Sequence, residues 1–164
     1  MKITKVKTAE VRVKIDDKRG YLYHYVRIYT DEGVYGTGEA SHVDGGWRGS
    51  TRSMAEQIIG KDPRDVDAIF EGIRRSYIFR GGMSGLGVSA LTGIEIALWD
   101  LAGKAHGVPV YRLLGGKFRD RVRLYVDSAK TNCEERAEEA RSKGFTAIKF
   151  DLDDANNPHK ADRW

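Results

Sequence analysis

The sequence predicts an α+β fold in which an antiparallel sheet and helices are followed by a βαβ unit. Apolar and polar residues alternate with period two in the first forty residues. From residue 50 the apolar spacing becomes three and four, which is typical of helices. The last part has a strand–helix–strand pattern. With 164 residues, 40% of them hydrophobic, the chain can bury one ordinary core or one domain plus the beginning of another.

Three strands and two turns are expected before residue 40. The strands lie in 3–15, 25–29 and 34–38, and the turns in 16–20 and 30–33. The turn Asp31-Glu-Gly33 is a typical hairpin turn, because glycine takes the positive φ that such a turn needs. The sequence therefore predicts a three-stranded antiparallel meander, followed by a polar, glycine-rich loop over 39–49.

Helices are expected from Ser50 onward. The first ends at Gly60, and Asp62 with Pro63 then predicts the start of a second helix, with an N-cap residue and a proline at the first position. One side of that helix carries Val66, Ile69, Phe70, Ile73 and Tyr77. The longest helix covers 88–106.

The final part predicts a βαβ unit with parallel strands. The strands are expected at 122–126 and 146–152, with a helix at 134–143 between them. An isolated parallel pair leaves its edges uncovered, so such a unit normally belongs to a larger sheet or barrel. Lys149 and Asp151 come together at the end of the second strand, either as catalytic groups or as an ion pair with no catalytic task.

The composition excludes several classes of protein. Charged residues make up 32% of the chain, no apolar stretch approaches the roughly 18 residues of a membrane span, and no signal peptide follows Met1, so we expect a cytoplasmic protein without a membrane partner. The lone cysteine, Cys133, is interpreted as structural. The net charge of +4 raises nucleic acid as a partner, but no binding motif accompanies it, so none is expected.

Two segments resemble the enolase superfamily and, within it, the mandelate racemase and muconate lactonizing enzyme group. The first is Gly93-Ile-Glu-Ile-Ala-Leu-Trp-Asp-Leu-Ala-Gly-Lys104 with Gly107-Val-Pro-Val110 and Leu113-Leu-Gly-Gly116, and the second is Gly144-Phe-Thr-Ala-Ile-Lys149. The resemblance implies a capping domain over 1–121 and the start of a TIM-type barrel over 122–164. A full barrel takes roughly 200 residues or more, so the resemblance implies a truncated, N-terminal portion.

Enzymes of this family abstract the proton beside a carboxylate, and Mg²⁺ holds the resulting enediolate. The resemblance implies metal ligands on the third, fourth and fifth barrel strands, which this sequence does not contain, so no metal ligand is assigned here. The parent protein is therefore expected to be a Mg²⁺-dependent enzyme, and these 164 residues alone are expected to be inactive.

The family's Lys-x-Lys pair indicates the reaction. Lys149 matches the first lysine, which helps to hold the substrate carboxylate, but Asp151 stands where the usual lysine base would be. A carboxylate two residues along a strand projects to the same face and would pair with Lys149. Members that dehydrate acid sugars often draw the base from a later strand, so the resemblance favours an aldonate or aldarate dehydratase.

Two alternatives stay open. One is a racemase, epimerase or cycloisomerase of the same superfamily, and the other is a non-catalytic cap module that associates with itself. A homo-oligomer is expected for the protein.

Two cap loops, 16–24 and 41–49, are implied to close over the substrate. Their cationic donors and an exposed aromatic wall suit a polyhydroxy acid. The substrate-binding candidates, with ordinary loop packing as the alternative, are Arg19, His24, His42, Trp47 and Arg48.

Overall fold

The computed structural model describes residues 1–14, 20–40, 46–78, 85–127 and 133–149. The chain divides into two compact units, Met1–Lys117 and Phe118–Trp164, which are described one at a time. The domain boundary expected at residue 121 stays a prediction.

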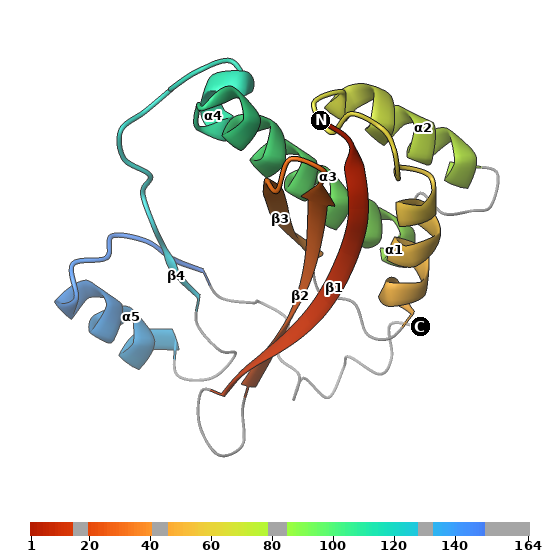
Figure 1. Cartoon of the computed structure of the whole chain (residues 1–164). Coiled ribbons are helices and arrows are strands. Elements are labelled where there is room, and N and C mark those ends of the chain that lie inside the picture. The colour runs from red at the N-terminus through yellow and green to blue at the C-terminus, as the bar shows by residue number, and fades with distance from the viewer. Residues whose placement is uncertain (15–19, 41–45, 79–84, 128–132, 150–164) are drawn as a thin grey trace. The chain divides into compact units, whose positions relative to one another are not determined.

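The first unit contains the predicted antiparallel meander. Its strands β1 (Ile3–Lys14), β2 (Gly20–Thr30) and β3 (Tyr35–Ala40) pair in that order (Figure 1). Gly33 takes a φ of 79° in the turn before β3, as the hairpin required. The meander expected from the period-two pattern is confirmed.

The β1–β2 ribbon is longer than β3. Glu10 pairs with His24, and the ribbon continues to the pair of Lys14 with Gly20. β3 reaches only as far as the pair of His24 with Ala40. Among the described residues, 20–23 of β2 therefore pair with β1 alone.

Helices α1 (Trp47–Glu56), α2 (Val66–Ile78), α3 (Gly85–His106) and α4 (Val110–Leu113) follow the sheet. Three of the expected starts are wrong, and one of them is that of α3, which begins at Gly85 rather than Val88. α1 begins at Trp47, three residues before Ser50, because the left-handed Gly46 turns the chain directly into the helix. α2 begins at Val66 rather than Pro63. Residues 62–65 form a separate turn, in which the Asp65 N–H donates to the Asp62 carbonyl oxygen at 3.2 Å and the Arg64 N–H donates to the Asp62 carboxylate.

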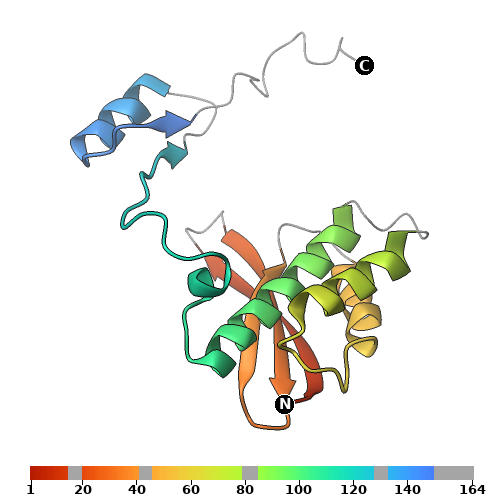
Figure 2. The same cartoon turned by 90° about the horizontal axis from the view of Figure 1, so that it is seen from above.

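One face of the sheet packs against α1 and α3, and α2 packs on α3 (Figure 2). The predicted apolar side of α2 is confirmed, since Val66, Ile69 and Ile73 are buried in this core. The other buried core residues, of which Ile58 lies in the turn after α1, are Ile3, Val26, Ile28, Ala40, Trp47, Met54, Ile58, Ala90, Leu91, Ile94, Ala97, Leu98, Leu101 and Ala102.

α3 lies very close to β3 because two glycines leave room for it. A Cβ atom at Gly36 would lie 2.0 Å from the carbonyl oxygen of Ala97, and one at Gly38 would lie 2.2 Å from that of Gly93. Any side chain at either strand position would therefore push the helix away.

α3 is also long and apolar enough to cross a membrane by length and composition alone. The expectation that no stretch approaches a membrane span is therefore wrong by this measure. The core helix of a soluble protein can be equally long and apolar, and 44% of the most apolar 18-residue stretch of α3 is buried inside the structure. The length and composition of α3 are therefore weak evidence that it spans a membrane.

The second unit contains β4 (Val126–Asp127), α5 (Cys133–Ser142) and β5 (Ile148–Lys149). β4 and β5 are parallel, which confirms the predicted βαβ unit. The first strand is shorter than expected, since 122–125 is not a strand. Val122 and Leu124 are exposed, and no described strand pairs with their segment, so the pairing that would make it a strand is lacking there.

Candidate functional site

Four side chains meet at one end of the first unit's sheet, and we call them the Glu10 cluster: Glu10, His24, Trp47 and Arg48. Glu10 and His24 are register partners on β1 and β2. Trp47 and Arg48 are the first two residues of α1. The cluster thus joins the β1–β2 ribbon to the start of α1.

The Glu10 carboxylate is the centre of this cluster. Nε1 of Trp47 donates a hydrogen bond to Oε1 of Glu10 at 3.2 Å, and Nε2 of His24 lies 3.8 Å from the same oxygen. Nη2 of Arg48 lies 3.0 Å from the other oxygen, Oε2. Both carboxylate oxygens therefore face donors, and the pairing fixes the first turn of α1 against β1.

The His24 ring is packed inside the unit. It is 4% exposed, and its centroid lies 4.7 Å from that of Trp47 with the rings tilted by 48°. Its Nδ1 atom is buried and has no hydrogen-bond partner among the described residues. Since buried polar atoms are normally hydrogen-bonded, Nδ1 is the polar atom of the cluster still open to a partner outside the described residues.

Trp47 is not the exposed loop aromatic that the sequence indicated. It is 1% exposed, because it opens a helix and its ring packs on His24 while its N–H binds Glu10. The neighbouring glycines resemble those of a loop, but Gly46 directly precedes the first residue of α1. A buried ring cannot form an exposed aromatic wall, so that expectation is corrected.

His24 likewise lies within β2 rather than in a loop, and it is buried. The Arg48 side chain is 56% exposed and presents its charge to solvent beside the cluster. Substrate roles for His24, Trp47 and Arg48 stay predictions. Three further site residues inferred from the sequence lie outside the described residues: Arg19, His42 and Asp151.

In the second unit, Lys149 meets a carboxylate that the sequence reasoning missed. Asp127 on β4 is the register partner of Lys149 on β5, and Nζ of Lys149 lies 3.6 Å from Oδ2 of Asp127. Both side chains are more than half exposed, so the pair contributes little stability. The signal was present in the sequence, because Asp127 comes directly after the strand expected at 122–126, and parallel strands end at the same sheet edge.

The described residues do not fit a resident divalent cation. They contain no group of three or more His, Cys, Asp or Glu side chains that could hold a metal ion. Asp127 and Lys149 together offer one carboxylate and one ammonium, whereas Mg²⁺ takes six oxygen ligands. No metal ligand is assigned within these residues.

Comparison with known proteins identifies the family. Residues 3–115 match the model of the mandelate racemase / muconate lactonizing enzyme, N-terminal domain. Among solved structures, a mandelate racemase/muconate lactonizing enzyme-like protein from Rubrobacter xylanophilus is 41% identical with a TM-score of 0.82, over 96% of this chain and 43% of that one.

Two curated relatives are named dehydratases. D-xylonate dehydratase of Haloferax volcanii is 41% identical over 150 residues, which cover 87% of this chain and 36% of the relative. D-galactonate dehydratase of Variovorax paradoxus is 40% identical over 128 residues, 76% of this chain and 31% of the relative. The chain spans about a third of the length of these relatives. The resemblance seen in the long helix is thus confirmed. The chain belongs to the mandelate racemase / muconate lactonizing enzyme family of the enolase superfamily, and its residues 3–115 form the N-terminal domain of that family.

Proposed function

We propose that this chain is the N-terminal portion of an acid-sugar dehydratase acting on an aldonate or aldarate. The observation that carries the proposal is the similarity, over most of the chain, to a relative named D-xylonate dehydratase. The relative named D-galactonate dehydratase supports the same substrate class. Both names describe loss of water from a sugar acid, which is a carboxylate with several hydroxyl groups.

The chemistry begins with removal of a proton beside a carboxylate, which places negative charge on the carboxylate oxygens. We propose that the Lys149 ammonium contacts that carboxylate. It lies at the end of β5, and its Nζ is within 3.6 Å of Asp127, which keeps it near the strand end. Asp151 is proposed to pair with Lys149 and not to act as the base.

The Glu10 cluster contributes to substrate binding mainly through Arg48. Its guanidinium is held by Glu10 yet remains more than half exposed, so it can still donate to a carboxylate or hydroxyl oxygen. His24 and Trp47 are buried and, in this proposal, act by fixing Arg48 and the start of α1. Arg19 and His42 keep their proposed role as substrate donors.

The proposal includes Mg²⁺ bound by residues outside those described. Bound there, the ion would stabilise the charge on the enediolate oxygens. A cytoplasmic location, a homo-oligomeric state and a small acid-sugar partner belong to the same proposal.

The test is incubation of the full-length protein with a panel of aldonic and aldaric acids and Mg²⁺. The expected product is a 2-keto-3-deoxy acid, detected by mass spectrometry as loss of one water, and its formation should stop with EDTA. Exchange of the α-hydrogen for deuterium without water loss would instead support the racemase or epimerase alternative. Absence of dehydration with every acid of the panel would refute the proposed dehydratase activity.

A further inference from the structure

The outer face of the sheet, which points away from α1 and α3, carries an unusual row of side chains. We call it the Lys7 row, and it contains Lys7, Arg27 and Thr37, one residue from each strand in register. The rows on either side of it are Lys5, Tyr29 and Tyr35, and Ala9, Tyr25 and Glu39. Aromatic rings therefore flank the Lys7 row on both sides.

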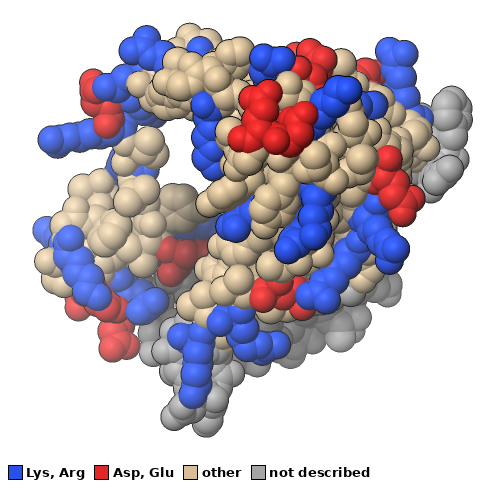
Figure 3. Space-filling view, viewed as in Figure 1, with Lys and Arg blue, Asp and Glu red and all other residues tan. Residues whose placement is uncertain are grey.

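Two cations stand directly opposite each other in this row. Lys7 and Arg27 are register partners, and like charges in that position destabilise a sheet. No described carboxylate forms an ion pair with either cation. Figure 3 shows Lys and Arg side chains over the strands in this view. The pair is an electrostatic conflict that the fold itself does not relieve.

The described contacts of the two cations are with rings and a hydroxyl. Nζ of Lys7 lies 5.7 Å from the Tyr29 ring centroid, and Cζ of Arg27 lies 4.6 Å from that of Tyr35. Nε of Arg27 donates to Oγ1 of Thr37 at 3.2 Å. The hydrogen bond orients the guanidinium and leaves its two terminal nitrogens without a described acceptor.

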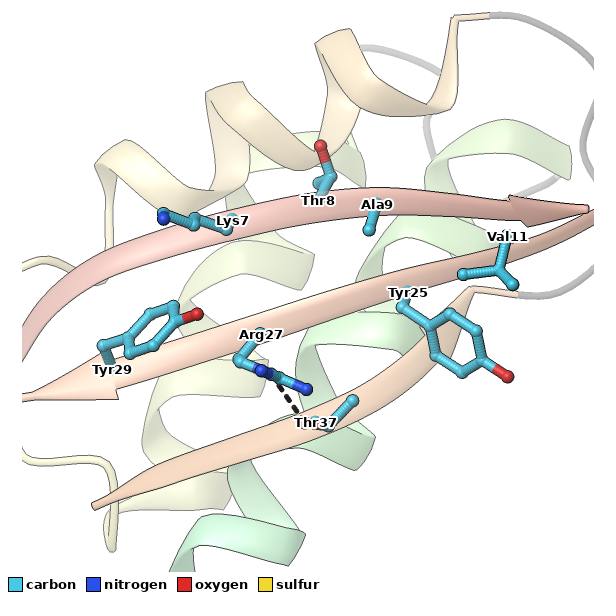
Figure 4. A pocket seen from close by; sticks show the side chains of 8 residues that line it. All are labelled: Lys7, Thr8, Ala9, Val11, Tyr25, Arg27, Tyr29 and Thr37. Atoms are coloured by element: carbon cyan, nitrogen blue, oxygen red, sulfur yellow. Dashed lines mark hydrogen bonds between the residues drawn. The ribbon is translucent and has the colours of Figure 1, made fainter. Parts of the chain in front are cut away.

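The same side chains surround a hollow of about 410 Å³. Its lining is Lys7, Thr8, Ala9, Val11, Tyr25, Arg27, Tyr29 and Thr37. Figure 4 shows Lys7, Arg27, Tyr25 and Tyr29 on the side of the sheet that faces away from the helices. The volume lies within the range of small-molecule sites, which is roughly 300–1,000 Å³.

We propose that this hollow binds an oxyanion, a carboxylate or phosphate group of a small anion, between Lys7 and Arg27. An oxyanion there neutralises both cations and accepts from the free end of the guanidinium, whose planar fork suits two oxygens. Glu39, in the next row, is the acidic residue among the described strand residues of this face, and it opposes the anion. The site is separate from the Glu10 cluster, which lies among inward-facing residues, and does not depend on the proposed dehydratase activity.

The test is a titration of the 164-residue chain with inorganic phosphate and, separately, with malonate at low ionic strength. Binding is followed by NMR at the Arg27 Nε–H and at the Thr37 backbone amide, and is expected to saturate and to weaken as NaCl is added. Saturation with phosphate alone or malonate alone identifies the source of the oxyanion, and either one supports the site.

Lys7→Glu is the decisive variant, because the new carboxylate can pair with Arg27 and so keeps the sheet folded. We expect phosphate or malonate affinity to fall at least tenfold while the melting temperature at low salt rises by about 2 °C. Arg52→Glu, the same charge change on the exposed side of α1, is the control and should retain affinity within about twofold. Glu39→Gln should strengthen binding.

Absence of a saturable shift in the unaltered chain overturns the proposal. Equal losses of affinity in Lys7→Glu and Arg52→Glu also overturn it, since they indicate attraction by the net charge of the molecule rather than by this hollow.

Discussion

The backbone N–H of Thr37 donates a hydrogen bond to Oδ2 of Asp100 at 2.8 Å, so a carboxylate of α3 covers a donor on the free edge of β3. Nζ of Lys104 binds the same oxygen at 2.7 Å and also donates to the carbonyl oxygen of Tyr35 at 2.9 Å. Free edges are sites at which other chains can add a strand. Two side chains one helical turn apart therefore protect this edge.

Asp100→Ala is expected to expose that edge. The free energy of unfolding should fall by about 1–3 kcal/mol, because the Thr37 N–H loses its acceptor, and association at high concentration should increase. Urea denaturation and light scattering measure the two effects. Glu138→Ala, an exposed change on α5, is the control, and equal behaviour of the two variants would show that Asp100 does not protect the edge.

Gly38→Ala is expected to be strongly destabilising. Its new Cβ would lie 2.2 Å from the carbonyl oxygen of Gly93, so α3 must shift, at a cost of about 1–3 kcal/mol or more. Gly49→Ala is the matched control, since it lies inside α1 with nothing within 4 Å of the added atom. That change should stabilise by about 0.5–1 kcal/mol. Thermal unfolding that shows similar shifts for both would contradict the close approach of α3.

Trp47→Phe is expected to loosen the Glu10 cluster. Phenylalanine keeps most of the ring packing but loses the hydrogen bond to the Glu10 carboxylate, at a cost of about 1.5–3 kcal/mol. Trp99→Phe is the comparison, because the Trp99 N–H has a longer hydrogen bond, 3.4 Å to Glu95, in a partly buried position. Chemical denaturation followed by circular dichroism should show the larger loss for Trp47→Phe. A larger loss for Trp99→Phe would mean that the Glu10 cluster is not a stabilising centre.

Stability should depend on pH through Glu71. Hydrogen bonds from Arg74 and Arg75 lower the pKa of the Glu71 carboxyl from its ordinary value of 4.5 to about 2. A lowered folded-state pKa stabilises the protein above the unfolded value, and that contribution is lost as the pH falls toward the folded value. The unaltered chain should therefore be more stable than Glu71→Gln at neutral pH, and the difference should disappear between about pH 4.5 and 2.

The magnitude will be modest, because the ion pairs of Glu71 are partly exposed to solvent. Thermal unfolding at several pH values measures it, with Glu56→Gln as the control, since Glu56 faces Arg52 at the longer distance of 3.9 Å. A difference that persists unchanged at pH 2 would contradict the role of the Glu71 charge.

Lys149→Gln in the full-length protein tests the proposed carboxylate contact. If dehydration is found, KM for the acid sugar should rise at least tenfold, because an ammonium-to-carboxylate hydrogen bond is lost. Lys143→Gln, which removes an exposed lysine paired with Glu139 on α5, is the control and should leave KM unchanged. Equal KM values for all three proteins would exclude substrate binding by Lys149.

The sequence predicted the elements of the fold better than their ends. Alternation in β2 and β3 and the spacing in α3 are strong periodic signals, and both were confirmed. The starts of α1 and α2 were missed because each depends on one local interaction. Gly46 takes a left-handed φ, and the Asp65 N–H closes a turn on the Asp62 carbonyl oxygen before α2 begins.

Features that depend on long-range pairing could not be predicted from periodicity. The alternation of Val11 and Val13 would place Glu10 on the outer face, yet both valines are exposed and Glu10 lies opposite His24 on the inner face. Only the position of α1 brings Trp47 to both. For Lys149 the sequence indicates the shared sheet edge, and the parallel register adds that Asp127 lies directly beside it. Apolar periodicity shows which face of an element is buried but not how closely two elements approach, so it did not predict the short distance between α3 and Gly38.

The apolar character of α3 has a consequence for the order of events during synthesis. Four of the elements that pack on it, β2, β3, α1 and α2, precede it in the chain, and the short α4 follows it. A ribosome therefore releases these four elements first, and α3 emerges into a surface already made to receive it. The helix that is apolar enough by composition to cross a membrane thus meets four of its partners as soon as it emerges.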